Sequence, residues 1–155
     1  MLPKLIENGG CFEDERGKIW TTHNSQDKKL NHVKATTNKK NTFRGFHGDS
    51  KTEKFTSCLV GKMNIYIICP KNLNSWEFQL DAKDALTLYI PKDFYHGYHS
   101  VSDSIYLYQL CYEGEYVDKE EQKTLLLEDS CIAEETKKTL LNDNGLIRSK
   151  RDSKI

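Results

Sequence analysis

The sequence has no long apolar segment and no net charge. Its longest apolar run covers five residues, Ile65 to Cys69, whereas a transmembrane helix needs about 20. Lysine and arginine together number 23, and so do aspartate and glutamate, which does not favour a nucleic-acid-binding protein with a strongly basic surface. The first residues have no apolar stretch of the kind found in signal peptides. We therefore expect no secretory signal, no membrane association and a cytoplasmic location.

Paired cysteines are absent as well. The chain has five cysteines, an odd number, and none of them are spaced as Cys-x-x-Cys. We therefore expect neither a disulfide framework nor a zinc site made of thiolates. Cys58, Cys69 and Cys111 lie within apolar runs, and we expect them to act as small buried side chains.

The chain is instead rich in short segments with the composition of β-strands. Turn-forming residues recur about every ten positions, and this spacing is typical of an antiparallel sandwich or barrel. The clearest strand segments are residues 18–23, 55–60, 63–69, 76–80, 86–90 and 104–112. In the last one, Tyr106, Tyr108 and Leu110 should share one face, and Ile105, Leu107 and Gln109 the other, because side chains alternate along a strand.

Length and composition also predict the domain organisation. A chain of 155 residues is expected to form one domain, residues 1–155. The segment Glu134–Leu141 has helical composition and predicts a short helix near the C-terminus.

Two histidines stand in settings that suggest a site. His47 is flanked by Arg44, Gly45 and Gly48, which indicates an open and polar environment. His96 follows an apolar segment that ends in Ile-Pro, and the strand ends of a small barrel face its mouth, where ligand sites tend to lie. Taken alone, a histidine is more often an ordinary surface or core residue than part of a site.

The order of motifs along the chain is more informative than any single motif. It resembles the dTDP-4-dehydrorhamnose 3,5-epimerase family of sugar-nucleotide epimerases, whose members have the cupin fold. The resemblance runs from about Phe12 to Asp152. The six matching motifs are Asp14-Glu15-Arg16-Gly17, Arg44-Gly45-Phe46-His47, Lys54-Phe55-Thr56, residues 90–98 with the pattern Ile-Pro-x-x-Phe-x-His-Gly-Tyr, Leu107-Tyr108, and Ser149-Lys150-Arg151-Asp152.

The resemblance implies a fold and an activity. The fold would be an all-β cupin jelly-roll barrel with a short helical or irregular C-terminal segment. The activity would be the inversion of C3, C5 or both in a nucleoside-diphosphate 4-keto-6-deoxy sugar, through an enolate intermediate. No cofactor and no metal are implied, because the ketone of the substrate already acidifies the neighbouring C–H bonds. Family members pair N-terminal strands across a two-fold axis, so a homodimer is expected.

The resemblance also implies roles for individual residues. His47 matches the family's base, Tyr108 its acid, and Lys54 the cation that faces the ketone oxygen. Asp152 matches the carboxylate that orients His47, with Asp129 as the competing candidate. The residues implied in substrate binding are Arg16 and Arg44 for the diphosphate or sugar, Lys34 and His96 in the pocket, and Tyr116, in competition with Tyr112, near the sugar.

Several departures from the family keep other functions open. Ile65 and Cys69 stand where the family has aspartates, and Lys34-Ala35-Thr36 stands in place of Gln-x-Asn. One alternative is a sugar-nucleotide 3,4-ketoisomerase, and another is a cupin that binds carbohydrate without catalysis. A third is a metal-binding cupin, whose ligands would be His47, Asp49, Glu53 and His96, a set suited to iron or manganese.

Overall fold

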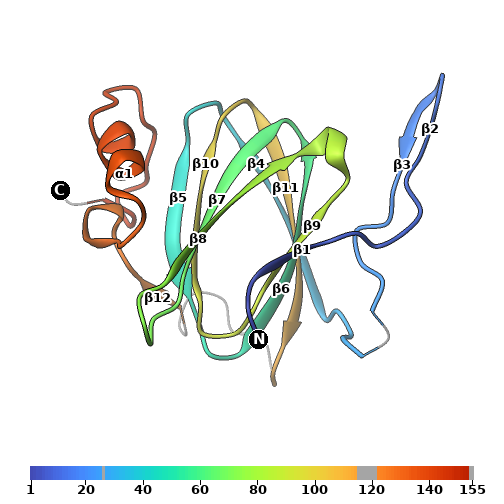
Figure 1. Ribbon diagram of the computed structural model, residues 1–155, viewed down its shortest axis with the longest axis horizontal. Coiled ribbons are helices and arrows are strands. Elements are labelled where there is room, and N and C mark those ends of the chain that lie inside the picture. Colours follow the sequence, from blue (N-terminus) through green and yellow to red (C-terminus); the bar gives the residue numbers. More distant parts are fainter. Residues whose placement is uncertain (26, 115–121, 154–155) are drawn as a thin grey trace.

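Two antiparallel five-stranded sheets face each other in the computed structural model, which describes residues 1–25, 27–114 and 122–153 (Figure 1). The first sheet has the strand order β1-β9-β6-β11-β4, and the second has the order β12-β5-β10-β7-β8. The strands of the first sheet are β1 (Lys4–Ile6), β4 (His32–Asn38), β6 (Thr52–Val60), β9 (Thr87–Ile90) and β11 (Ser104–Tyr112). Those of the second are β5 (Phe43–Gly48), β7 (Lys62–Ile68), β8 (Ser75–Asp81), β10 (Tyr95–Ser100) and β12 (Lys123–Thr124). This architecture confirms the predicted all-β jelly roll.

The remaining elements are short. They are the hairpin of β2 (Phe12–Asp14) and β3 (Gly17–Ile19), the 3-10 helices η1 (Ala82–Asp84) and η2 (Leu127–Asp129), and the helix α1 (Glu134–Leu141). The predicted C-terminal helix is confirmed with the same bounds. No helix in the described part of the chain has the length and apolar content that a membrane span requires.

The predicted strand over residues 18–23 is wrong beyond Ile19, where β3 ends. The chain then runs across the outer face of the first sheet. There the backbone carbonyl of Thr22 accepts hydrogen bonds from Gln109 Nε2 and from Thr87 Oγ1, both at 2.9 Å. The backbone carbonyl of Thr22 is thus satisfied by side chains and not by a neighbouring strand, so no strand is needed there.

The inner faces of the two sheets enclose an apolar core. It contains Cys58, Met63, Ile65, Ile67, Leu80, Leu88, Ile90, Tyr98 and Tyr106, with Tyr108 packed against it. The predicted alternation along β11 is therefore confirmed, since Tyr106 and Tyr108 both face this core. All five cysteines are free; Cys58 and Cys69 are buried as predicted, whereas Cys111 is only partly buried.

A second apolar cluster covers the outer face of the second sheet. It joins Phe43, Phe46, Tyr66 and Ile68 of the sheet to Leu127, Ile132 and Leu140 of the C-terminal segment. Tyr66 and Ile68 lie on the opposite face of β7 from Ile65 and Ile67, so this strand is buried on both faces. The cluster holds the segment containing α1 beside β5, on one side of the barrel (Figure 1).

A local irregularity in β5 decides which side chains enter the barrel. The register between β5 and β10 shifts between His96 and Gly97, so that His96 pairs with His47 but Gly97 pairs with Gly45. In a regular strand Arg44 and His47 would lie on opposite faces, because side chains alternate. The extra residue places both of them in the barrel cavity, while Phe43 and Phe46 both enter the outer cluster.

The irregularity requires glycine at position 45. The Gly45 φ angle is +116°, and a Cβ atom there would lie 2.6 Å from Gly97 Cα and 2.8 Å from the carbonyl oxygen of His96. These contacts are with backbone atoms, which cannot move aside as a flexible side chain can. The two strands therefore approach this closely only because both residues lack a side chain.

We predict that Gly45→Ala lowers the free energy of unfolding by on the order of 1–3 kcal/mol or more, because it combines backbone strain with a steric clash. Urea denaturation would measure the loss. Gly9→Ala is a matched control, since Gly9 also has a positive φ, +68°, but nothing lies within 4 Å of its Cβ position. An equal loss in the two variants would show that the contact with Gly97 has no energetic weight.

Candidate active site

A cavity of about 440 Å³ opens between the two sheets. Seven of the nine residues implicated from the sequence line it: Lys34, Arg44, His47, Lys54, His96, Tyr108 and Asp152. They come from five different strands and the C-terminal tail. Of the other two, Arg16 does not line the cavity, and Tyr116 lies outside the described residues.

Strand pairing brings these distant residues together. Tyr108 on β11 is the register partner of Lys34 on β4, and Lys54 on β6 pairs with Leu110 on β11. In the second sheet, His47 on β5 pairs with His96 on β10. The cavity therefore has Lys34, Lys54 and Tyr108 on one sheet and both histidines on the other.

His47 is held by a buried carboxylate. Its Nε2 lies 3.2 Å from Oδ1 of Asp152, and the other carboxylate oxygen accepts a hydrogen bond of 3.0 Å from the backbone N–H of Gly45. Burial alone would raise the pKa of Asp152, but the bonds from His47 and Gly45 outweigh it and lower the pKa. The alternative carboxylate, Asp129, is exposed in η2.

The cation of Lys54 lies inside the barrel. Its side chain is only 4% exposed, and its Nζ lies 3.7 Å from Oδ2 of Asp49 and 3.4 Å from the carbonyl oxygen of Thr52. A buried ammonium group is costly unless it is paired and hydrogen-bonded. The Lys54 ammonium therefore has a buried counter-ion.

His96 is a neutral side chain of the cavity. Burial lowers its pKa well below the ordinary value, and the nearby Lys54 and His47 lower it further. Its Nε2 atom is buried and has no hydrogen-bond partner among the described residues. Buried polar atoms are normally satisfied, so an unpaired nitrogen at this position is unusual.

Tyr108 faces the cavity from the opposite sheet to His47. Its ring centroid lies 4.6 Å from that of Tyr106 and 6.3 Å from that of His96. Burial raises the pKa of Tyr108 well above its ordinary value, and the neighbouring phenols of Tyr98 and Tyr106 add to this effect. The phenol is therefore protonated at neutral pH.

The cavity has an excess of positive charge. Lys34, Arg44, Lys54 and Arg151 line it, and Asp152 is the one carboxylate among the described lining residues. Arg44 is exposed, donates a hydrogen bond of 2.9 Å from Nε to Asn38 Oδ1, and also lines an adjoining cavity of about 710 Å³. An anionic ligand is expected in such a cavity.

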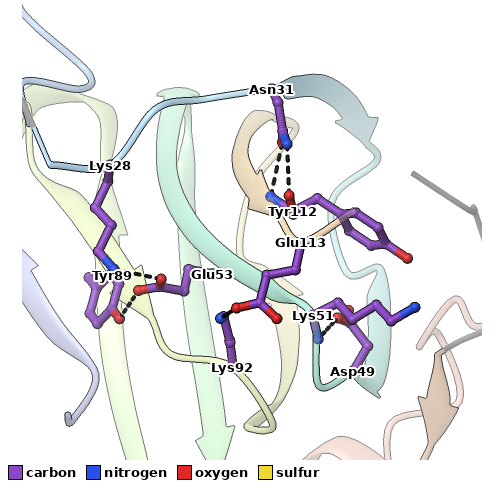
Figure 2. A network of polar contacts seen from close by, with 9 residues as sticks. All are labelled: Lys28, Asn31, Asp49, Lys51, Glu53, Tyr89, Lys92, Tyr112 and Glu113. Carbon is purple, nitrogen blue, oxygen red and sulfur yellow. Dashed lines mark hydrogen bonds and ion pairs between the residues drawn. The ribbon is translucent and has the colours of Figure 1, made fainter. Parts of the chain in front are cut away.

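Arg16 and Glu53 are placed away from this cavity. Arg16 lies at the turn of the β2–β3 hairpin, where its side chain is 82% exposed and pairs with Asp14 at 2.5 Å. Glu53 is on the opposite face of β6 from Lys54 and binds Lys28 and the Tyr89 hydroxyl (Figure 2). Within residues 1–25, 27–114 and 122–153, no group of three or more His, Cys, Asp or Glu side chains is gathered to hold a metal ion.

Sequence reasoning missed five residues of the lining, which are Thr36, Leu110, Gln122, Ser149 and Arg151. Two of them were accessible from periodicity, since Thr36 follows Lys34 and Leu110 follows Tyr108 at the strand spacing of two. Gln122, Ser149 and Arg151 are in irregular segments, where no periodic signal indicates which side chains face inward.

The C-terminal tail that provides Asp152 is fixed by a second ion pair. Nη1 and Nη2 of Arg148 lie 2.5 and 2.9 Å from the two carboxylate oxygens of Glu128 in η2. Nη2 also donates to the backbone carbonyl of Asp152. Such two-point pairing fixes the guanidinium in one plane. The position of Asp152 beside His47 thus depends on the link between the tail and η2.

Comparison with known proteins gives a consistent result. A sequence profile of the dTDP-4-dehydrorhamnose 3,5-epimerase family matches residues 4–155. No curated protein matches the sequence. A solved dTDP-4-dehydrorhamnose 3,5-epimerase from Elizabethkingia anophelis is similar with a TM-score of 0.74 and 21% identity, over 97% of this chain and 87% of its own.

Two further structures with the same fold are proteins named for other reactions. A 3'-monoepimerase from Streptomyces bikiniensis in complex with dTDP-quinovose has a TM-score of 0.77 and 14% identity, over 97% of this chain and 80% of its own. A sugar 3,4-ketoisomerase from Thermoanaerobacterium thermosaccharolyticum in complex with TDP has a TM-score of 0.65 and 20% identity, over 78% of this chain and 86% of its own. The fold is therefore shared among proteins that are named for different reactions.

We predict that Arg148→Met loosens the tail. The amide of Asp152, which bonds to the carbonyl of Ser149 at 3.2 Å, should exchange with solvent on the order of tenfold faster, because the link to Glu128 is lost. Hydrogen-exchange mass spectrometry would measure it. Lys83→Met is the control, since Lys83 pairs with Asp81 at 3.6 Å on the exposed surface. Unchanged exchange in Arg148→Met would mean that the tail is held by other contacts.

Proposed function

The chain belongs to the dTDP-4-dehydrorhamnose 3,5-epimerase family, and from this membership and the cavity we propose that it epimerises a nucleoside-diphosphate 4-keto-6-deoxy sugar at C3, C5 or both. The observation that carries the proposal is the placement of His47 and Tyr108 on opposite sheets, facing one cavity. Inversion of a carbon requires proton removal on one face and proton return on the other. A base and a phenol on opposite walls meet this requirement.

Four groups in the cavity have a role in the proposed reaction. His47 takes the proton from the carbon beside the ketone, and Asp152 stabilises the imidazolium that results. The electron pair of the C–H bond moves to the ketone oxygen, where the ammonium of Lys54 stabilises the enolate. Tyr108 then gives its proton to the same carbon from the other side. The proton on His47 and the one missing from Tyr108 are exchanged with solvent before the next turnover.

The diphosphate of the substrate is assigned to the cations nearer to solvent. Arg44 and Arg151 are exposed, and Lys34 is partly buried, in contrast to Lys54 inside the barrel. Guanidinium groups bind phosphate oxygens in pairs, which suits Arg44 at the edge between the two cavities. No cofactor is proposed, because the ketone supplies the acidity that the reaction needs.

The number of inverted carbons distinguishes a monoepimerase from a 3,5-epimerase. The similar Streptomyces bikiniensis structure is a monoepimerase, and the Elizabethkingia anophelis structure is a 3,5-epimerase. Both reactions pass through the same type of enolate. Following solvent deuterium into C3 and C5 separately distinguishes them, and a ketoisomerase would be recognised by movement of the ketone itself.

We predict that Tyr108→Phe separates proton removal from inversion. Epimerised product should fall on the order of 10²–10⁴-fold, the usual contribution of a general acid, while exchange of substrate protons with heavy water falls much less. His47→Asn should abolish both, because no other group starts the reaction. NMR in heavy water measures exchange and product ratio together, with a panel of nucleoside-diphosphate 4-keto-6-deoxy sugars.

Tyr66→Phe is the matched control for this experiment. Tyr66 is a buried phenol stacked on Phe43 in the outer cluster, away from the cavity, so its removal should leave both rates unchanged. If Tyr108→Phe forms product at the wild-type rate, the acid is a different residue. Exchange at the wild-type rate in His47→Asn would refute the proposed mechanism.

We also propose that the protein acts as a homodimer in which the β2–β3 hairpin serves the partner's cavity. The hairpin projects from the side of the barrel away from α1 (Figure 1). Its cross-strand pair Phe12 and Ile19 is 72% and 73% exposed, an arrangement that a second copy would cover. An isolated two-stranded hairpin is marginally stable in water, so a partner would also stabilise it. Arg16 at the turn could then reach the diphosphate of a substrate bound to the other subunit.

We predict that two inactive variants complement each other if the site is shared. Arg16→Ala and His47→Asn, mixed and allowed to re-form dimers, should recover about one quarter of wild-type activity, because half of the dimers are mixed and each holds one complete site. Light scattering would confirm the dimer, and Phe12→Ser should weaken it while Leu141→Gln, at an exposed apolar position on α1, should not. Absence of recovery in dimers shown to be mixed would place Arg16 outside the partner's site.

A further inference from the structure

Lys54 lies between apolar residues within its own sheet. Its strand neighbours in register are Ile90 on β9 and Leu110 on β11, and both are almost fully buried. The uncharged titratable groups that share the cavity with it are His96, kept neutral by its environment, and the protonated phenol of Tyr108. The cavity is also lined by the cations of Lys34, Arg44 and Arg151, by His47, and by Asp152, whose carboxylate is paired with His47.

Asp49 supplies the negative charge beside Lys54. In the described chain it is the one carboxylate within ion-pair distance of Lys54, with Oδ2 3.7 Å from Nζ and a side chain 6% exposed. The other nearby carboxylates have different partners: Asp152 binds His47 and Gly45, and Glu53 binds Lys28 and Tyr89 on the outer face of β6 (Figure 2).

The carboxylate of Asp49 is held in a fixed position. Its Oδ1 accepts a hydrogen bond of 2.9 Å from the backbone N–H of Lys51, as Figure 2 shows. Its backbone carbonyl accepts one of 2.8 Å from the N–H of Asp93, in the loop between β9 and β10. One oxygen therefore closes the turn after β5, while the other is left to face Lys54. Such an arrangement requires no reorganisation when charge develops in the cavity.

We infer that Asp49 is a positioning residue of the proposed reaction, and that its carboxylate keeps the ammonium of Lys54 charged and aimed at the enolate oxygen. This inference rests on the proposed function. Its support from electrostatics is that burial lowers the pKa of Lys54 whereas Asp49 raises it. Without Asp49, Lys54 would lose its proton at a lower pH and could no longer stabilise the enolate as a cation.

The test is Asp49→Asn, in which the amide oxygen can still accept the hydrogen bond from Lys51. We expect the pKa of Lys54 to fall further by about one pH unit or more, because a charge about 4 Å away is lost from a buried site. The alkaline limb of the pH–rate profile should move to lower pH by the same amount. Since Asp49 does not touch the substrate, kcat should fall and KM should stay nearly constant. Asp49→Glu should restore part of kcat.

Asp81→Asn is the matched control. Asp81 accepts the same type of hydrogen bond, from the N–H of Lys83 at 3.1 Å, and pairs with the Lys83 ammonium at 3.6 Å. That pair lies on the surface, where Lys83 is 78% exposed. Asp81→Asn removes the same kind of ion pair from the same kind of turn, but at an exposed position. It should therefore leave the Lys54 titration and the pH profile unchanged.

The titration of Lys54 should be followed directly by NMR of ¹⁵N-labelled lysine, with the signal assigned from its loss in Lys54→Met. Because this NMR measurement needs no substrate, it tests the role of Asp49 separately from the proposed epimerase function. A shifted titration in a protein that exchanges no sugar proton would refute the proposed function but keep Asp49 as the counter-ion. An identical titration in wild type and Asp49→Asn would overturn the inference.

A double substitution is the control for possible unfolding of Asp49→Asn. If Asp49→Asn unfolds because Lys54 is left unpaired, then adding Lys54→Met should restore stability toward that of the wild type. Urea denaturation of the single and double variants measures this coupling. Additive losses would show that Asp49 acts on the loop and not on Lys54, and would also overturn the inference.

Discussion

The close backbone contact between Gly45 and Gly97 is the constraint on which the site depends. It permits the register shift that turns Arg44 and His47 onto the same face of β5. The same turn of the chain presents the N–H of Gly45 to Asp152, so the carboxylate that holds His47 is anchored at the irregularity itself. A regular strand at this place would have put Arg44 and His47 on opposite faces. One packing contact between glycines thus determines both the direction of the base and the position of its partner.

The cavity costs the barrel part of its apolar core, and the outer cluster offsets this loss. Buried polar and charged groups occupy one end of the space between the sheets, where apolar side chains would otherwise pack. On the other side of β5, Phe43 and Phe46 are fully buried beneath the C-terminal segment. That segment in turn provides Asp152. The element that completes the site is therefore also the one whose packing stabilises the sheet that holds it.

Much of the fold was predictable because strand composition and alternation are local properties. The helix Glu134–Leu141 and the inward face of β11 followed from composition and from the two-residue period. The site residues could be named only through the order of motifs, since register, a non-local property, brings them together. The irregularity at Gly45 and the pairing of Lys54 with Asp49 leave no signal in composition or periodicity. For the same reason, the position of Arg16 on a projecting hairpin could not be predicted from its motif.

The charges of the cavity are divided by depth. Arg44 and Arg151 are exposed, so water and salt weaken their interaction with any anion. Lys54 is buried, and the same charge acts there through a medium of lower polarity, where its effect on a nearby oxyanion is several times larger. A diphosphate carries its charge throughout the reaction, whereas the enolate oxygen gains its charge only as the proton leaves. Screened cations suit the diphosphate, because substrate must bind and product must leave. An unscreened cation suits the enolate oxygen, because only an interaction that strengthens along the reaction lowers the reaction barrier.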